Sequence, residues 1–279
     1  MIFWKKLPAP RFPLPAPAPS GLGFSCPRSP VCINLARMLT DKSWRPEAVI
    51  QFCGSQVACL CLGGLLIGLL DKLGLAAFKL PDGLGAVVLG TLSFQGASWG
   101  LIGLFLWQHQ TGWREFFGLR DPEVARAVRL AVIMIVLLLP VLWGLQAASV
   151  WGLTRFGLHP EEETAVQLLQ DNHAVWFRVY LAGFAVVLAP VAEEFIFRGM
   201  LFTFLKQLGL PRLAWFGVSG LFALIHHNEV AFVPLFVLAL ALTWLYQRTG
   251  NLLASITAHA FFNGVNLAVM LILPDAPGT

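Results

Sequence analysis

Seven long stretches of this sequence carry few or no charged residues, and most of them are long enough to cross a lipid bilayer as a helix. A hydrocarbon core of about 30 Å requires roughly 20 helical residues. Five stretches contain no Asp, Glu, Lys or Arg, namely residues 48–70, 83–113, 130–154, 230–247 and 249–274. A sixth, 213–228, is shorter, and a seventh, 179–205, contains two glutamates and an arginine. The pattern predicts an all-α fold, a polytopic bundle of about seven transmembrane helices, with eight as the alternative count.

The overall composition agrees with a chain that is surrounded by lipid. Apolar residues make up 57% of it and charged residues 12%, whereas soluble domains contain about 45–50% and about 25%. The formal net charge of +4 does not indicate a nucleic-acid partner, because the basic residues stand singly between apolar stretches instead of forming one basic face. We therefore expect a lipid bilayer around the protein and no nucleic acid bound to it.

The distribution of Lys and Arg predicts the orientation in the membrane. If the chain crosses seven times, fourteen of them fall on the side that holds the N-terminus and four on the other side. The positive-inside rule then puts the N-terminus in the cytoplasm, and for a prokaryotic source the membrane would be the plasma membrane. Five tryptophans stand near span ends, where an indole prefers the membrane interface: Trp44, Trp107, Trp151, Trp176 and Trp244.

Two regions of the chain differ in composition. Residues 1–46 begin with a tract rich in Pro and Ala, a composition that favours neither a helix nor the apolar segment of a signal peptide. We expect a disordered cytoplasmic tail there, with Met38 as an alternative start of translation. Residues 47–279 form the predicted transmembrane domain.

The stretch 179–205 is unusual because it contains Glu193, Glu194 and Arg198 within about one and a half helical turns. On insertion scales a charge at the centre of a membrane helix costs about 2.5–3.5 kcal/mol, so each needs a partner. Glu194 and Arg198 are four residues apart and share a helix face, where they can form an ion pair. Glu193 points about 100° away, so it either becomes protonated or finds a partner on another helix. A structural ion network between helices is the alternative to a functional site.

Four polar residues lie at a similar predicted depth in the membrane. They are Glu193, His226, His259 and Asn263. Each is 11 to 15 residues from a flanking basic residue on the same membrane face, which corresponds to roughly 16–23 Å of helix. His259 and Asn263 are four residues apart and share a helix face, as do Phe222 and His226. We therefore expect three helices to bring these side chains together.

Such a set of side chains can hydrolyse a peptide bond without a side-chain nucleophile. A carboxylate and an imidazole can take a proton from water, while a second imidazole and a carboxamide stabilise the oxyanion. Alternatively, Glu193, His226 and His259 can supply the carboxylate and two imidazoles of a catalytic zinc site. The residues alone leave both chemistries open. His227, next to His226, is expected to be structural or to face outward.

Three short motifs resemble those of a known family. EEFIFR at 193–198, FALIH at 222–226 and HAFFN at 259–263 are similar to the EExxxR, FxxxH and HxxxN signatures of the CAAX-protease and bacteriocin-processing (CPBP) family of intramembrane proteases. The motifs occur in the family's order on separate helices, and the resemblance extends over about residues 110–272. It implies a helical bundle with a membrane-embedded active-site cavity, and endopeptidase activity on a peptide or a membrane-anchored protein.

The resemblance also implies a role for each motif residue. Glu193 would activate the water with help from His226. His259 and Asn263 would form the oxyanion site. The supporting residues would be Glu194, Arg198 and Phe222. Although the family is often described as metalloproteases, a glutamate-activated water is the mechanism that we expect, with a divalent metal such as zinc as the alternative. The substrate would be a prenylated CAAX protein, or a leader or signalling peptide.

Other functions remain as alternatives. The string Gly217-Val218-Ser219-Gly220 resembles the GxSG motif of rhomboid serine proteases, for which His259 would be the base. A proton-coupled transporter would use the same intramembrane carboxylates and histidines as a relay. An immunity or binding protein would keep the fold without requiring Glu193. The endopeptidase is preferred because all of the hydrolytic groups are present.

Overall fold

The computed structural model describes residues 44–74, 84–117, 123–158 and 175–272. All regular secondary structure in these ranges is helical, which confirms the predicted all-α fold. Almost all of the predicted tail, 1–46, lies outside the described residues. Its disorder, and the boundary between tail and transmembrane domain, stay predictions.

Six helices in the described part of the chain are long and apolar enough to cross a membrane. They are α2 (Pro46–Lys72), the continuous helix Val88–Gln108, α6 (Glu123–Arg155), the continuous helix Val175–Gln207, α12 (Phe232–Thr249) and α13 (Leu252–Ile272). A further apolar helix, Leu213–Leu224, is shorter. These seven helices coincide with the seven stretches found in the sequence, so the prediction of an integral membrane protein with about seven spans is confirmed.

Three of the apolar helices contain π-helical segments. The helix Val88–Gln108 consists of the second half of α3 (Leu84–Thr91) followed by η3 (Leu92–Gly96) and α4 (Ala97–Gln108). Val175–Gln207 consists of α8 (Val175–Gly183), η4 (Phe184–Leu188), α9 (Ala189–Glu194), η5 (Phe195–Phe202) and α10 (Thr203–Gln207). Leu213–Leu224 consists of η6 (Leu213–Gly217) and α11 (Val218–Leu224). A short helix, α5 (Trp113–Phe116), precedes α6. The two glutamates of the charged stretch therefore lie directly before a change of helical pitch.

Carbonyl groups within the π-helical segments accept hydrogen bonds from side chains. A π-helix pairs residues five apart instead of four, so a change of pitch leaves a carbonyl without its usual amide partner. In η3, the Phe94 carbonyl accepts from Gln56 Nε2 at 3.0 Å and from Ser98 Oγ at 2.6 Å. In η4, the Ala185 carbonyl accepts from Asn263 Nδ2 at 2.8 Å. The bonds from Gln56 and Asn263 each join two helices where one of them changes pitch.

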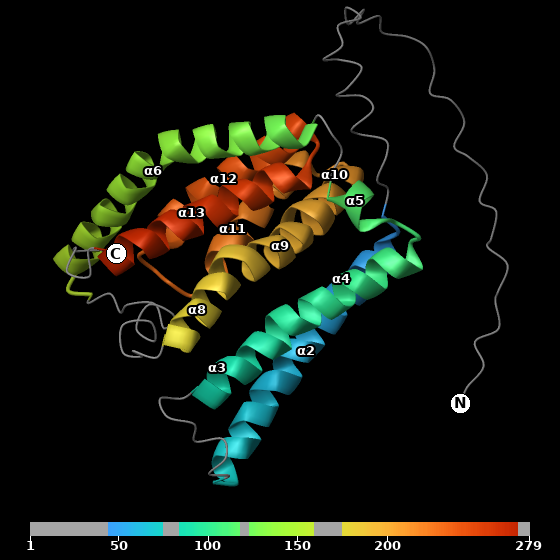
Figure 1. Ribbon diagram of the computed structural model, residues 1–279, viewed down its shortest axis with the longest axis horizontal. Helices are drawn as coiled ribbons and strands as arrows, with labels where there is room; N and C mark the ends of the chain where they lie inside the picture. Colours follow the sequence, from blue (N-terminus) through green and yellow to red (C-terminus); the bar gives the residue numbers. More distant parts are fainter. Residues whose placement is uncertain (1–43, 75–83, 118–122, 159–174, 273–279) are drawn as a thin grey trace, which may run out of the picture. The chain divides into compact units, whose positions relative to one another are not determined.

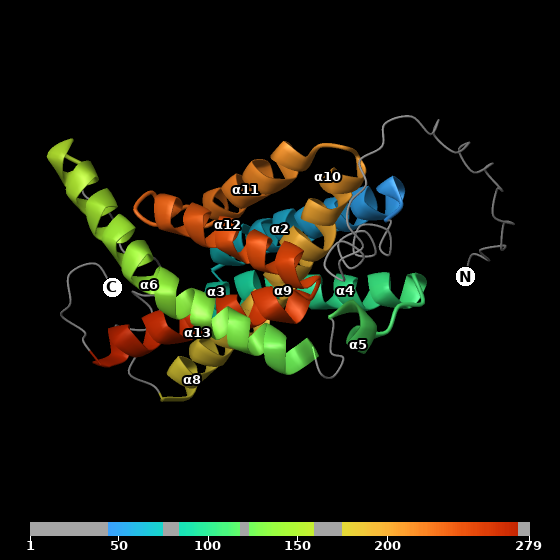
Figure 2. The same ribbon diagram turned by 90° about the horizontal axis from the view of Figure 1, so that it is seen from above.

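The charged helix α8–α10 lies between two groups of helices (Figure 1). On one side α2 packs against α3, η3 and α4, and α4 contacts α9. On the other side α13 packs against η4, α9 and α6, while α12 packs against α6, α11 and α13. Seen from above, α6 runs obliquely across α13 (Figure 2). Because α9 has neighbours on both sides, its carboxylates are shielded from lipid.

Two clusters of apolar side chains hold these groups together. The first is rich in aromatic rings and joins α2, α4 and α5 to η5; its central members are Trp44, Phe52, Phe105, Phe116 and Phe195. The second joins α6, α12 and α13 through small and branched side chains such as Ala131, Ile135, Leu242 and Ala258. Lipid is as apolar as these side chains, so close packing is what favours the association.

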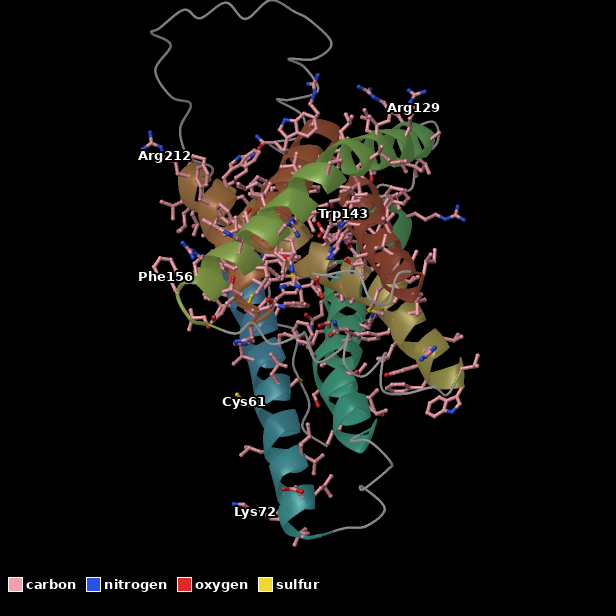
Figure 3. The ribbon with its side chains drawn as sticks, turned by 90° about the vertical axis from the view of Figure 1, so that its left-hand side faces the viewer. Cys61, Lys72, Arg129, Trp143, Phe156 and Arg212 are labelled. Carbon is pink, nitrogen blue, oxygen red and sulfur yellow. The ribbon has the colours of Figure 1, made fainter. Side chains whose placement is uncertain are left out.

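The charged ends of the bundle agree with the two sides assigned from the sequence. Figure 3 shows Arg129 and Arg212 at one end and Lys72 at the other. Four of the five span-end tryptophans are 50% exposed or more, as expected at an interface: Trp107, Trp151, Trp176 and Trp244. Trp44 also stands at a span end, directly before α2, but its ring packs inside the aromatic cluster and is only 8% exposed.

Candidate active site

The carboxylate of Glu194 is the centre of the buried polar site. Its Oε1 accepts a hydrogen bond from Arg198 Nη1 at 2.7 Å, and neither side chain is exposed. The ion pair predicted from the four-residue spacing is therefore present. The same Oε1 lies 3.0 Å from Nδ1 of His259 on α13. One oxygen atom thus links the charged helix to the last helix of the bundle.

Arg198 connects this centre to two further helices. Its Nη2 donates a hydrogen bond to the Ala239 carbonyl of α12 at 3.0 Å. Its guanidinium lies over the ring of Phe222 on α11, 4.8 Å from the ring centroid, a distance at which a cation is attracted to an aromatic face. The ion pair is thus held from three directions, as a charge pair in a low-dielectric interior requires.

Glu193 finds its partner on another helix. Its Oε2 lies 3.8 Å from Nε2 of His259, while Nδ1 of the same ring faces Glu194. Glu194 already accepts from Arg198, so it acts as an acceptor and His259 Nδ1 donates to it. In the neutral imidazole this leaves the lone pair of Nε2 directed toward Glu193. Of the alternatives that the sequence left open for Glu193, a partner on another helix is the one observed.

His226 lies in the turn that follows α11, with its ring beside Phe222. Its Nδ1 is 2.7 Å from the Phe222 carbonyl, which can only accept, so Nδ1 donates and Nε2 carries the lone pair. The ring is half-buried and lies within electrostatic range of Glu193. His227 has a positive φ of 50° and an exposed side chain, which confirms the prediction that it is structural or faces outward.

Phe222 contacts most of the site's members. Its ring centroid is 4.8 Å from that of His226 and 5.5 Å from that of His259, in addition to the contact with Arg198. Phe222 is fully buried. The ring thus packs against both imidazoles and against the cation, and the supporting role predicted for it stays a prediction.

Asn263 is held at the edge of the site by a backbone group. Its Nδ2 donates to the Ala185 carbonyl in η4, and its helix neighbour one turn earlier is His259. One amide hydrogen and the carboxamide oxygen are left over from this bond. The role of Asn263 in an oxyanion site stays a prediction.

The site also includes two backbone carbonyl groups that no sequence motif indicates. These are the carbonyls of Ala239 and Ala185, which bind Arg198 and Asn263. Every residue has a backbone carbonyl, so a sequence pattern carries no signal for such a partner. Only the packing of α12 and η4 against the charged helix and α13 brings them into position.

The described residues do not assemble the alternative zinc site. No three His, Cys, Asp or Glu side chains in the described ranges are placed so that they could hold a metal ion. Glu193 and His259 approach each other, but the set with His226 is not gathered into a ligand group. The serine-protease alternative also lacks its pairing, because Ser219 Oγ is buried without a hydrogen-bond partner among the described residues.

The site coincides with a family match. Residues 174–265 match the family model of Type II CAAX prenyl endopeptidase Rce1-like proteins. The matched segment is therefore similar to CAAX proteases. The resemblance of the three motifs is thereby confirmed. Searches of the curated proteins and of the solved structures found no significant match.

The matched segment contains every side chain of the site. It extends from the start of α8 into α13 and includes all three motifs. It is narrower than the residues 110–272 that the resemblance was expected to cover. Helices α2 to α6 lie before the matched segment, and of these α4 contacts α9 directly.

Proposed function

We propose that this protein is an intramembrane endopeptidase of the CAAX-protease type, which hydrolyses a peptide bond with a water molecule activated by Glu193. The arrangement of His259 between two carboxylates carries the proposal. Glu194 holds one ring nitrogen, and the other nitrogen faces Glu193 at 3.8 Å. A purely structural ion network would require only the Glu194–Arg198 pair and would leave the second carboxylate unexplained.

The geometry suits a water molecule held between base and imidazole. A water that makes ordinary hydrogen bonds of about 2.8 Å can reach both Glu193 Oε2 and His259 Nε2 across that gap. Glu193 removes a proton from this water as its oxygen attacks the peptide carbonyl carbon. The tetrahedral intermediate then collapses, the C–N bond breaks, and the proton passes to the leaving amine.

The remaining groups stabilise the charge that develops on the carbonyl oxygen. His226 in its protonated form can donate from Nε2, since Nδ1 is already bound to the Phe222 carbonyl. Asn263 can donate with the amide hydrogen that does not bind Ala185. Donors of this kind in a water-poor site contribute about 2.7–4 kcal/mol each to transition-state stabilisation. No step in this scheme passes through a metal ion.

The matched family names the substrate class that we propose. Its description refers to prenylated CAAX proteins, so we propose a substrate whose scissile bond is presented near a lipid or a membrane anchor; a leader or signalling peptide is the alternative. We also propose that the N-terminus faces the cytoplasm, because the side that holds it carries most of the Lys and Arg residues. For a prokaryotic source the membrane is then the plasma membrane.

Cleavage by purified protein tests the proposal. Wild type, Glu193→Gln and Glu47→Gln are reconstituted in nanodiscs and incubated with a mixed library of lipidated and plain peptides. Glu47 is an exposed carboxylate at the start of α2 and serves as the matched control. We expect cleavage by wild type and Glu47→Gln and none by Glu193→Gln. Full activity in Glu193→Gln would refute the mechanism.

Two additions to this experiment separate the alternatives. A strong chelator that abolishes cleavage would show that a metal is required. Cleavage that depends on Glu193 would decide against a transporter and against an immunity or binding protein, neither of which needs peptide hydrolysis. Ser219→Ala should retain most activity, because the Ser219 hydroxyl is not paired with a base.

A further inference from the structure

Trp44, just before α2, forms hydrogen bonds with the helix that carries the candidate site. Its indole Nε1 donates to the Gly199 carbonyl at 3.0 Å, a buried bond between residues 155 positions apart. Its main-chain N–H donates to Gln207 Oε1 at 3.1 Å. Gly199 follows Arg198 directly in η5, and Gln207 ends α10. The tryptophan therefore holds the charged helix at two points after the Glu193–Arg198 motif.

The π-helical pitch of η5 makes the Gly199 carbonyl available. The preceding carbonyl, that of Arg198, accepts a hydrogen bond from the Thr203 hydroxyl at 3.0 Å, so two successive carbonyls are bound by side chains. The absence of a side chain at Gly199 leaves room for Phe116, because a Cβ there would lie 3.0 Å from Phe116 Cζ, closer than an ordinary contact. The rings of Trp44 and Phe116 can thus pack closely against this segment, with their centroids 5.9 Å apart.

The pitch of η5 determines which way the two glutamates point. A π-helical turn contains one residue more than the α-helical turn that it replaces. One residue corresponds to about 100° of rotation about the helix axis. If η5 relaxed to α-helical pitch while α10 stayed in place, α9 would rotate relative to α13. Glu194 and Glu193 would then turn away from His259, to which they lie at 3.0 and 3.8 Å.

We propose that Trp44 is a positioning residue for the candidate active site, whose indole N–H stabilises the π-helical pitch of η5 and so directs Glu193 and Glu194 toward His259. The inference rests on the proposed function, because positioning is defined by the reaction that the site performs. It adds a residue from outside the matched segment 174–265. Trp44 acts through Gly199 and touches none of the reacting groups.

Two tryptophan substitutions test this proposal as a matched pair. Trp44→Phe keeps an aromatic ring in the cluster and removes the donor to Gly199. Trp99→Phe removes an indole N–H of α4 that has no hydrogen-bond partner among the described residues, and its ring packs against the same aromatic cluster. Amide hydrogen exchange of residues 195–204 is measured first in nanodiscs. We expect faster exchange there in Trp44→Phe and wild-type exchange in Trp99→Phe.

The pH profile of peptide cleavage distinguishes positioning from simple loss of folded protein. A changed distance between Glu193 and His259 alters the shape of the kcat profile, whereas a smaller folded fraction lowers kcat by the same factor at every pH. We expect Trp44→Phe to lower kcat about fivefold, the effect of losing one ordinary hydrogen bond, with a little-changed KM and an altered profile. Trp99→Phe should match wild type in both.

Two outcomes would overturn the proposal. One is unchanged exchange in residues 195–204 of Trp44→Phe, which would show that the indole N–H does not stabilise the pitch of η5. The other is a kcat profile of unchanged shape, which would reduce Trp44 to a packing role. Failure of the proposed function looks different, because wild type itself would then cleave no peptide while the exchange experiment would still report on the Trp44–Gly199 bond.

Discussion

Glu194 has an arginine and a histidine as partners at one oxygen atom, and its carboxylate is completely buried. The second oxygen, Oε2, makes no hydrogen bond with the described residues, so the stability of the charge depends on Arg198 and His259. Removing one partner of a buried charge pair leaves the other uncompensated in a low-dielectric interior, which is costlier than losing a surface ion pair. At the scale of single residues, the Glu194 carboxylate therefore has two tasks. It stabilises the protein by pairing with Arg198, and it holds the His259 ring that faces Glu193.

Replacing Glu194 should destabilise the protein strongly. We expect Glu194→Leu to lower the free energy of unfolding by about 3–5 kcal/mol, because Arg198 loses its buried counter-charge. Reversible unfolding in mixed micelles measures the change. The double variant Glu194→Leu with Arg198→Met should regain much of the stability and remain inactive. A loss below about 1 kcal/mol in the single variant, similar to that of exposed Glu47→Leu, would contradict the prediction.

The adjacent histidines should respond in opposite ways. His226→Gln is expected to lower kcat by at least about 100-fold, the scale of losing a hydrogen-bond donor to the oxyanion. His227→Gln should change it by less than about twofold, because the His227 side chain is exposed in the turn. Steady-state cleavage of one peptide by both variants measures this difference. Equal effects of the two substitutions would show that the turn itself, and not the His226 imidazole, is required.

At the scale of elements, changes of helical pitch and small residues determine how the helices meet. Asn263 reaches a carbonyl of η4, and Trp44 reaches one of η5. Gly63 allows α2 to approach η3, because a Cβ at this position would collide with the side chain of Ser93. Small residues at such contacts favour helix association in membranes, where there is no hydrophobic effect between helices to do so.

A larger side chain at this contact should separate the two helices. We expect Gly63→Leu to lower the free energy of unfolding by about 1–3 kcal/mol, as overpacking does in well-packed interiors. Gly64→Leu is the matched control, because nothing lies within 4 Å of a Cβ built at Gly64, which is exposed. Thermal unfolding in detergent measures both. If Gly64→Leu were as destabilising as Gly63→Leu, the contact with Ser93 would not be the cause.

At the scale of the whole molecule, the two ends of the bundle should face opposite sides of the membrane. Arg212 and Lys72 lie at opposite ends (Figure 3), and from the charge distribution we propose that the end with Arg212 faces the cytoplasm. The expectation concerns orientation only. It is independent of the chemistry at Glu193 and can be tested without a substrate.

Cysteine labelling in intact cells tests the orientation. The five native cysteines are first replaced by serine, and Lys72→Cys and Arg212→Cys are introduced separately. A membrane-impermeant maleimide should label Lys72→Cys from outside and label Arg212→Cys only after the cells are permeabilised. The reverse pattern would show that the N-terminus faces outward.

Much of this architecture follows from the sequence alone. The lengths of the charge-free stretches determine the spans, because the bilayer thickness sets how many helical residues are needed. The spacing of Glu194 and Arg198 determines their ion pair, because residues four apart share a helix face. The three motifs indicate the family, and Glu193, His226, His259 and Asn263 as candidate catalytic residues. These properties are local, because each depends on residues that are close together in the sequence.

Only the tertiary structure decides which partner each group has. Glu193 faces His259, Arg198 reaches the Ala239 carbonyl, and the buried Trp44 indole donates to the Gly199 carbonyl. Each of these partners is more than 40 residues away along the chain or is a backbone carbonyl, which every residue possesses. The packing of helices and the points where their pitch changes bring such groups together, and neither leaves a recognisable pattern in the amino-acid sequence.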